Sequence, residues 1–140
     1  MTCATCYSWR PSRNQRKDEL STELVKEALR QMGALGVDEI VFSGGEPLLR
    51  PDLGEILRVA KGECSLRVYL LTNGTLVQDK IARTLAPYVD VVCISLDGLT
   101  EEENALIRGR GVWSKYSISQ DRSEFSFQFL NGVRPLDRFW

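Results

Sequence analysis

Apolar residues recur three or four positions apart in three stretches of the chain, the spacing of one buried helix face. Each stretch therefore predicts an amphipathic helix of a few turns. The apolar positions are Leu24, Val25, Ala28, Leu29 and Met32, then Leu53, Ile56, Leu57 and Ala60, then Leu76, Ile81, Ala82 and Leu85. The expected boundary residues are the cap Ser21 with Gly33 or Gly36, then Pro51 with Gly62, and finally Pro87.

Short apolar runs lie between these helices, and each ends in a polar turn that contains glycine. The runs are Ile40–Phe42, Val68–Leu71 and Val89–Leu96, and the turns begin at Ser43, Thr72 and Asp97. Apolar strands separated by helices are typical of a parallel sheet covered on both faces. We therefore predict an α/β fold of repeated βα units. Its three turns share one edge of the sheet, where such folds bind ligands.

The pattern is lost from Val112 onward, so we divide the chain into a core of residues 1–111 and a divergent, aromatic-rich tail of residues 112–140. Seven of the twelve aromatic residues lie in this tail, and Phe125–Phe129 alternates like a half-buried strand. Two hypotheses fit. The tail supplies one further strand and a loose end, or it is not native to the domain. Residues 8–17 carry four basic side chains and no apolar period, and we predict a loop there.

Composition narrows the function classes. The 140 residues are 43% hydrophobic and 26% charged, which is typical of one soluble globular domain. The net charge of -1 favours neither nucleic acid nor an anionic membrane as partner. The absence of histidine excludes a Ser/His/Asp triad, a histidine base and any histidine-containing metal site in this chain. With no secretory signal and no apolar run of about 20 residues, we expect a cytoplasmic protein with no membrane partner.

Four cysteines remain as soft ligands, and two of them are paired. Cys3 and Cys6 form a C-x-x-C, the spacing that lets two thiolates hold one metal or form a redox disulfide. A zinc site lacks its second pair, because Cys64 and Cys93 lie far apart. A thiol-disulfide oxidoreductase stays open as a hypothesis, although nothing before Cys3 supplies the strand that such an enzyme places there.

The strand-end turns carry the other candidate chemistry. Gly44 and Gly45 allow close approach to the backbone, while Glu46 offers a carboxylate for an ammonium group and Pro47 fixes the chain direction. The turns at residues 72–75 and 95–98 add amide, hydroxyl and carboxylate groups, including the ribose-capable Ser95 and Asp97. Each turn alone is compatible with an ordinary solvated turn. Their occurrence together and in this order is more specific.

In this combination the sequence resembles the radical S-adenosylmethionine (SAM) superfamily, and most closely its peptide and cofactor maturases. The resemblance runs from Met1 to about Gly111. Cys3, Cys6 and Tyr7 match the second and third cysteines and the aromatic residue of the C-x-x-x-C-x-x-C hallmark. The resemblance implies metal ligation by Cys3 and Cys6. It implies cofactor binding by Tyr7, Gly44, Gly45, Glu46, Pro47, Thr72, Asn73, Ser95, Asp97 and Arg108.

The same resemblance implies fold, cofactors and partners. It implies a partial (β/α)6 TIM-like barrel, and a [4Fe-4S] cluster that three thiolates hold while SAM chelates the open iron. It also implies reductive cleavage of SAM to a 5′-deoxyadenosyl radical, a low-potential electron donor such as flavodoxin or ferredoxin, and a peptide or a cofactor precursor as substrate. The first cysteine and the opening strand of the family fold would fall before Met1, and its last strands are absent too, so we expect an incomplete core. Cys64 and Cys93 are expected to be core thiols.

A second hypothesis belongs to another class. A chain with two of three cluster thiolates could be a non-catalytic protein that binds SAM weakly, or a poorly folded remnant with unpaired strand edges. Cluster content separates the enzyme from the non-catalytic protein, and the pKa of the paired thiols tests the oxidoreductase.

Overall fold

The computed structural model describes residue 4 and residues 19–98, 100–111 and 127–129. The helices are α1 (Thr22–Ala34), α2 (Leu53–Arg58), α3 (Asp79–Leu85) and α4 (Glu101–Arg108), and the strands are β1 (Glu39–Phe42), β2 (Arg67–Thr72), β3 (Val91–Ile94) and β4 (Phe127–Phe129). The strands form one parallel sheet in the order β1-β2-β3-β4. Among the described helices, none combines the length and apolar content that crossing a membrane requires.

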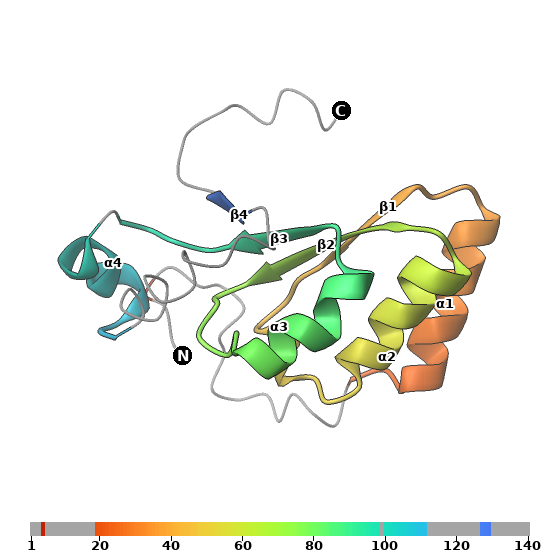
Figure 1. Ribbon diagram of the computed structural model, residues 1–140, viewed down its shortest axis with the longest axis horizontal. Helices are drawn as coiled ribbons and strands as arrows, with labels where there is room; N and C mark the ends of the chain where they lie inside the picture. Colours follow the sequence, from red (N-terminus) through yellow and green to blue (C-terminus); the bar gives the residue numbers. More distant parts are fainter. Residues whose placement is uncertain (1–3, 5–18, 99, 112–126, 130–140) are drawn as a thin grey trace.

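The predicted alternation of strands and helices is confirmed. Figure 1 shows α1, α2 and α3 along one face of the sheet, and α4 beyond the carboxyl end of β3. Phe42 is in register with Leu70, and Thr72 with Ile94, so the three strands end at one edge as expected. β4 lies within the predicted strand Phe125–Phe129 and pairs with β3. The rest of the tail lies outside the described residues.

The core fills the layer between the helices and the sheet. Its buried members are Leu29, Leu53, Ile56, Leu57, Val59, Ala60, Leu66, Val68, Leu70 and Leu85. A small apolar cavity of about 30 Å³ lies at its edge, lined by Leu48, Leu70, Val77, Ile81, Ala82, Leu85, Val89 and Val92. A void of this size with an apolar lining costs packing contacts without offering a water any partner.

The expectation that both faces of every strand are covered is wrong for β1 and β2. Burial alternates along both strands, and Val41, on the face away from the helices, is 54% exposed. Of β1, β2 and β3, whose burial the structure describes, β3 is buried at every position. Helices α1, α2 and α3 lie on one face only, so the residues of β1 and β2 that point to the other face stay partly open.

The helix boundaries agree with the sequence at some ends and differ at others. Ser21 caps α1, its Oγ accepting from Leu24 N at 3.3 Å, and Gly36, with φ +81°, follows the C-cap. Gly62 does not end α2, because the helix continues through a π turn (Val59–Glu63) that closes with Cys64 N donating to Val59 O at 3.0 Å.

The third helix and the last predicted apolar run are shorter than expected. α3 begins at Asp79 rather than near Leu76 and ends before a 3₁₀ turn that contains Pro87. β3 spans four residues of the predicted run Val89–Leu96. The outer residues of that run therefore belong to the connections on either side of the strand.

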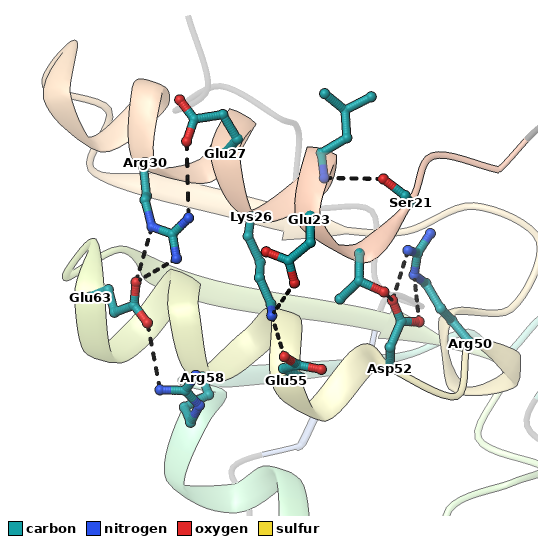
Figure 2. A network of polar contacts seen from close by, with 12 residues as sticks. Ser21, Glu23, Lys26, Glu27, Arg30, Arg50, Asp52, Glu55, Arg58 and Glu63 are labelled. Atoms are coloured by element: carbon teal, nitrogen blue, oxygen red, sulfur yellow. Dashed lines mark hydrogen bonds and ion pairs between the residues drawn. The ribbon is translucent and has the colours of Figure 1, made fainter.

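Ion pairs join α1 to α2 and the π turn (Figure 2). Lys26 is 6% exposed, and its Nζ donates to Glu23 at 2.9 Å and to Glu55. The hydrogen bonds to Glu55 and Glu23 raise the pKa of the Lys26 ammonium. Across the same interface, Arg30 and Glu63 form a further ion pair and Thr22 donates a hydrogen bond to Asp52. A third ion pair, Arg58–Glu63, joins α2 to the π turn. A charged side chain therefore lies in a buried helix position because two carboxylates compensate it.

Candidate functional site at the carboxyl edge of the sheet

Three loops meet at the carboxyl edge of the sheet, as the sequence predicts. They follow β1 at Ser43, β2 at Asn73 and β3 at Ser95. The second and third loops are joined at their bases, because Ser95 N donates to Thr72 O at 3.0 Å. Parallel strands bring the first residues after each strand to one edge, and here those residues carry most of the candidate chemistry.

Glu46 ties the first loop to the second. Its Oε1 accepts from Leu48 N at 3.1 Å and from Thr72 Oγ1 at 2.7 Å, while its Oε2 accepts from Asn73 N at 2.8 Å. A carboxylate has about four lone-pair positions. The three hydrogen bonds from described residues fix the carboxylate in place and use three of those positions.

Gly44 and Gly45 stand beside this carboxylate with open space around them. Gly44 has φ +138°, a conformation that residues with a side chain rarely adopt. A Cβ built on either glycine would meet no atom of the described residues within 4 Å. Pro47 then starts a 3₁₀ turn (Pro47–Leu49) with Glu46 as its N-cap. The glycine backbone is therefore accessible to a ligand, while the next residues are held rigidly.

The predicted ligand-binding residues of the second loop have structural contacts. Thr72 is 2% exposed, and its hydroxyl both donates to Glu46 and accepts from Gly74 N at 3.0 Å. Asn73 Oδ1 accepts from Thr75 N at 2.9 Å and from Thr75 Oγ1 at 2.6 Å. Both side chains shape the loop, and Thr72 acts on Glu46 rather than presenting itself to a ligand.

The third loop is held by helix α4. Arg108 Nε lies 2.5 Å from Asp97 Oδ2, with the two side chains 16% and 29% exposed. Asn104 Oδ1 accepts from Asp97 N at 3.1 Å, and Asn104 is fully buried. Asn104 was not predicted from the sequence, because it follows three glutamates in a short helix and looks like one more polar residue there. Ser95, the other predicted residue here, is half-buried.

The predicted metal ligands Cys3 and Cys6, and Tyr7 with them, lie outside the described residues. Between the two cysteines, Ala4 N donates to Ile107 O at 2.8 Å, so this point of the segment touches the end of α4, next to Arg108. Elsewhere in the described chain, no three side chains of the metal-binding types come together.

The other two thiols are core thiols, as predicted. Cys64 packs against the core at the end of the π turn, before β2 begins, which puts it at the opposite edge of the sheet. Cys93 is buried in β3, and burial raises the pKa of its thiol. Cys64 and Cys93 are both free. Neither lies at the loops where a cluster thiolate is needed.

Comparison of the sequence with known proteins identifies related proteins. The radical SAM superfamily model matches residues 1–117, which include the cysteine pair, the three loops and α4. AdoMet-dependent heme synthase of Methanosarcina barkeri is 39% identical over 92 residues, covering 65% of this chain and 26% of that protein. Mycofactocin maturase MftC of Mycobacterium tuberculosis is 37% identical over 113 residues, covering 79% and 28%. The chain thus spans between a quarter and a third of the length of these relatives.

Solved structures share the fold. Native anSMEcpe with bound AdoMet superposes with a TM-score of 0.74 at 21% identity, over 91% of this chain and 39% of that one. Streptococcus suis SuiB gives a TM-score of 0.71 at 22% identity, over 91% and 29%. With the family match running across the cysteine pair and all three loops, this chain belongs to the radical SAM superfamily and is homologous to its enzymes.

Proposed function

We propose that this chain is the SAM-binding core of a radical SAM enzyme, with the cofactor at the carboxyl edge of the sheet. The observation that carries the proposal is the geometry around Glu46. Among the described residues, one carboxylate joins two loops with three hydrogen bonds of about four it can accept, and it lies beside two glycines on which a Cβ would meet no atom within 4 Å. An ammonium group next to an accessible backbone fits that arrangement.

Glycine and carboxylate residues of the first and third loops then have roles at the SAM molecule. Glu46 accepts from the SAM ammonium, while Gly44 and Gly45 admit the methionine part to the backbone. Asp97 accepts from a ribose hydroxyl, and its pairing with Arg108 keeps the local charge balanced. The hydrogen bond of Ala4 N to Ile107 O holds the residue after Cys3 at the end of this helix, which supports the proposal.

The residues present fit SAM more completely than they fit a cluster. Bound together, a [4Fe-4S] cluster and SAM supply reductive cleavage to methionine and a 5′-deoxyadenosyl radical that abstracts hydrogen from substrate. Cys3 and Cys6 are the thiolates that this chain offers. A cluster with one open iron needs a third, and neither Cys64 nor Cys93 lies where it could supply it. We therefore propose cluster binding only together with a thiolate four residues before Cys3.

The whole protein's fold and partners belong to the same proposal. The four parallel strands are consistent with part of a (β/α)6 barrel, whose opening strand would lie beside β1 and whose last strands would lie beyond β4. A low-potential donor such as flavodoxin or ferredoxin would supply the electron, and a peptide or cofactor precursor would be the substrate. The maturase relatives support this substrate class.

The test compares three chains after anaerobic iron-sulfur reconstitution. The first is the printed chain, the second carries an added N-terminal extension ending in Cys-Asn before Met1, and the third ends in Ser-Asn instead. The cysteine extension restores C-x-x-x-C-x-x-C, and the serine extension is its matched control. Iron content and the electron paramagnetic resonance spectrum are measured with and without SAM.

We expect four stable irons and a SAM-dependent spectral change only with the cysteine extension. A stable, SAM-responsive cluster in the printed chain would show that Cys3 and Cys6 do not need the added thiolate. No cluster in any of the three chains, with SAM still bound, would favour a non-catalytic SAM-binding protein. Absence of both cluster and SAM binding would refute the proposed function.

A further inference from the structure

Helix α4 contacts the turn at Asp97 and Gly98 through one of its faces. Asn104 Oδ1 accepts from Asp97 N at 3.1 Å, and Arg108 Nε pairs with Asp97 Oδ2 at 2.5 Å. These two residues are four positions apart, so they lie on the same face of the helix. One helix face therefore holds both the backbone and the carboxylate of Asp97.

Gly98 allows the turn to pack closely against α4. A Cβ at position 98 would lie 2.4 Å from Glu103 Cβ and 2.6 Å from Asn104 N, so no side chain fits between the turn and the helix. The helix begins only three residues later, with Thr100 Oγ1 accepting from Glu103 N at 3.2 Å. The short connection and the close packing leave the turn little freedom to move relative to α4.

Asn104 is an unusual residue for the position it occupies. Its side chain is fully buried, yet no described residue offers Nδ2 a hydrogen-bond partner. An apolar residue there would avoid an unpaired buried donor. What the asparagine contributes is the Oδ1 acceptor for Asp97 N, which is the one hydrogen bond that its side chain makes within the part of the chain that the structure describes.

We propose that Asn104 is a positioning residue that, with Gly98, fixes the Asp97 carboxylate at the place where it receives a ribose hydroxyl. The proposal rests on the proposed SAM site and adds to it a residue that does not touch the cofactor. Arg108 holds the carboxylate by charge, and Asn104 sets the direction of the backbone that carries it. The Arg108 pair leaves lone-pair positions on Asp97 for the hydroxyl.

The first experiment tests, without any ligand, whether Asn104 holds the Asp97 amide. Hydrogen exchange of the Asp97 amide is followed by nuclear magnetic resonance in the 140-residue chain, in Asn104→Ala and in Leu106→Ala. Leu106 is 81% exposed on the same helix and serves as the matched control. We expect Asn104→Ala to speed exchange of the Asp97 amide about tenfold or more, because that amide loses its acceptor, and Leu106→Ala to leave it unchanged.

The second experiment measures how much each ribose hydroxyl contributes to ligand affinity. Affinities for S-adenosylhomocysteine and for its 2′-deoxy and 3′-deoxy forms are compared by calorimetry in the wild-type chain, Asn104→Ala and Gly98→Ala. A hydroxyl bound to a carboxylate gives the wild-type chain a preference of about tenfold or more over one deoxy form. The added Cβ of Gly98→Ala would clash with α4 and displace the turn from the helix. Both variants are therefore expected to reduce this preference to about threefold or less.

The outcomes separate this inference from the proposed function. If both variants weaken all three ligands equally and keep the wild-type preference, Asn104 has only a structural role and the inference is wrong. Unchanged exchange of the Asp97 amide in Asn104→Ala overturns it as well. If the wild-type chain binds none of the ligands, the proposed SAM site and the ribose role fall together, while the exchange data still decide whether Asn104 holds the turn.

Discussion

Removing the Glu46 carboxylate tests the central feature of the site. Glu46→Ala deletes three hydrogen bonds and leaves Leu48 N, Asn73 N and the Thr72 hydroxyl without their acceptor. Hydrogen bonds to charged groups contribute about 1.5–3 kcal/mol each when buried. Glu46 is only half-buried, so water compensates part of the loss. We expect the free energy of unfolding to fall by about 2–4 kcal/mol.

Glu46→Gln separates shape from charge. Glutamine fills the same space, but one of its terminal atoms is a donor that must face either Asn73 N or Leu48 N and the Thr72 hydroxyl. We expect a smaller loss of about 1–2 kcal/mol, together with weaker binding of S-adenosylhomocysteine.

The assay is urea unfolding followed by circular dichroism, with linear extrapolation to water. Glu102→Gln is the control, because Glu102 is exposed on α4 and its change should stay within about 0.5 kcal/mol. If Glu46→Ala is no less stable than this control, the carboxylate does not hold the two loops together. The argument for a preorganised ammonium site would then fail with it.

Three further predictions concern the Asp90 carboxylate, the apolar cavity beside Val92 and the buried thiol of Cys93. Burial acts to raise the pKa of Asp90, but hydrogen bonds from Lys61 Nζ (2.6 Å) and Val68 N (2.7 Å) hold it below the usual value of 3.8. The stability that Asp90 contributes is therefore complete above that value and is lost as the pH falls through the lower folded pKa, so Asp90→Asn should flatten the acid limb of a stability-pH curve. Val92→Ile places one methylene toward the apolar cavity and should raise the free energy of unfolding by up to about 0.8 kcal/mol, whereas the same addition to Val68, 0% exposed, should lower it by about 1–3 kcal/mol. Cys93, buried and with a raised thiol pKa, should resist iodoacetamide at pH 8 until the chain is unfolded, and rapid labelling measured by mass spectrometry in the folded chain would contradict its placement.

The order of elements could be predicted because it depends on local pattern. Strand and helix periodicities differ, and glycine or proline separates the two at most boundaries. The position of the site followed from topology, since parallel strands end at one edge. The covering of the sheet could not be predicted in the same way. Val41 is as apolar as its neighbours, yet it faces the side without helices and stays 54% exposed.

The contacts inside the site could not be predicted because they join residues distant in sequence. Glu46 and Thr72 are 26 positions apart, and the sequence does not show that they share a hydrogen bond. From the sequence, Lys26 looks like another solvated charge on α1, and only the structure shows that it contacts Glu55. Asn104 is less visible still, since its importance depends on a single backbone amide and on the absence of a side chain at Gly98.

The π turn at Val59–Glu63 has a consequence for how the chain tolerates changes in length. A π turn holds one residue more than an α turn, and the surplus is absorbed between Val59 O and Cys64 N. Gly62 is exposed there and touches nothing that a side chain would disturb. Deleting it would convert the bulge into a regular α turn while leaving β2 in register with β1. A single-residue deletion is therefore tolerable at this point, whereas the same deletion inside β2 would move every following side chain to the opposite face of the sheet.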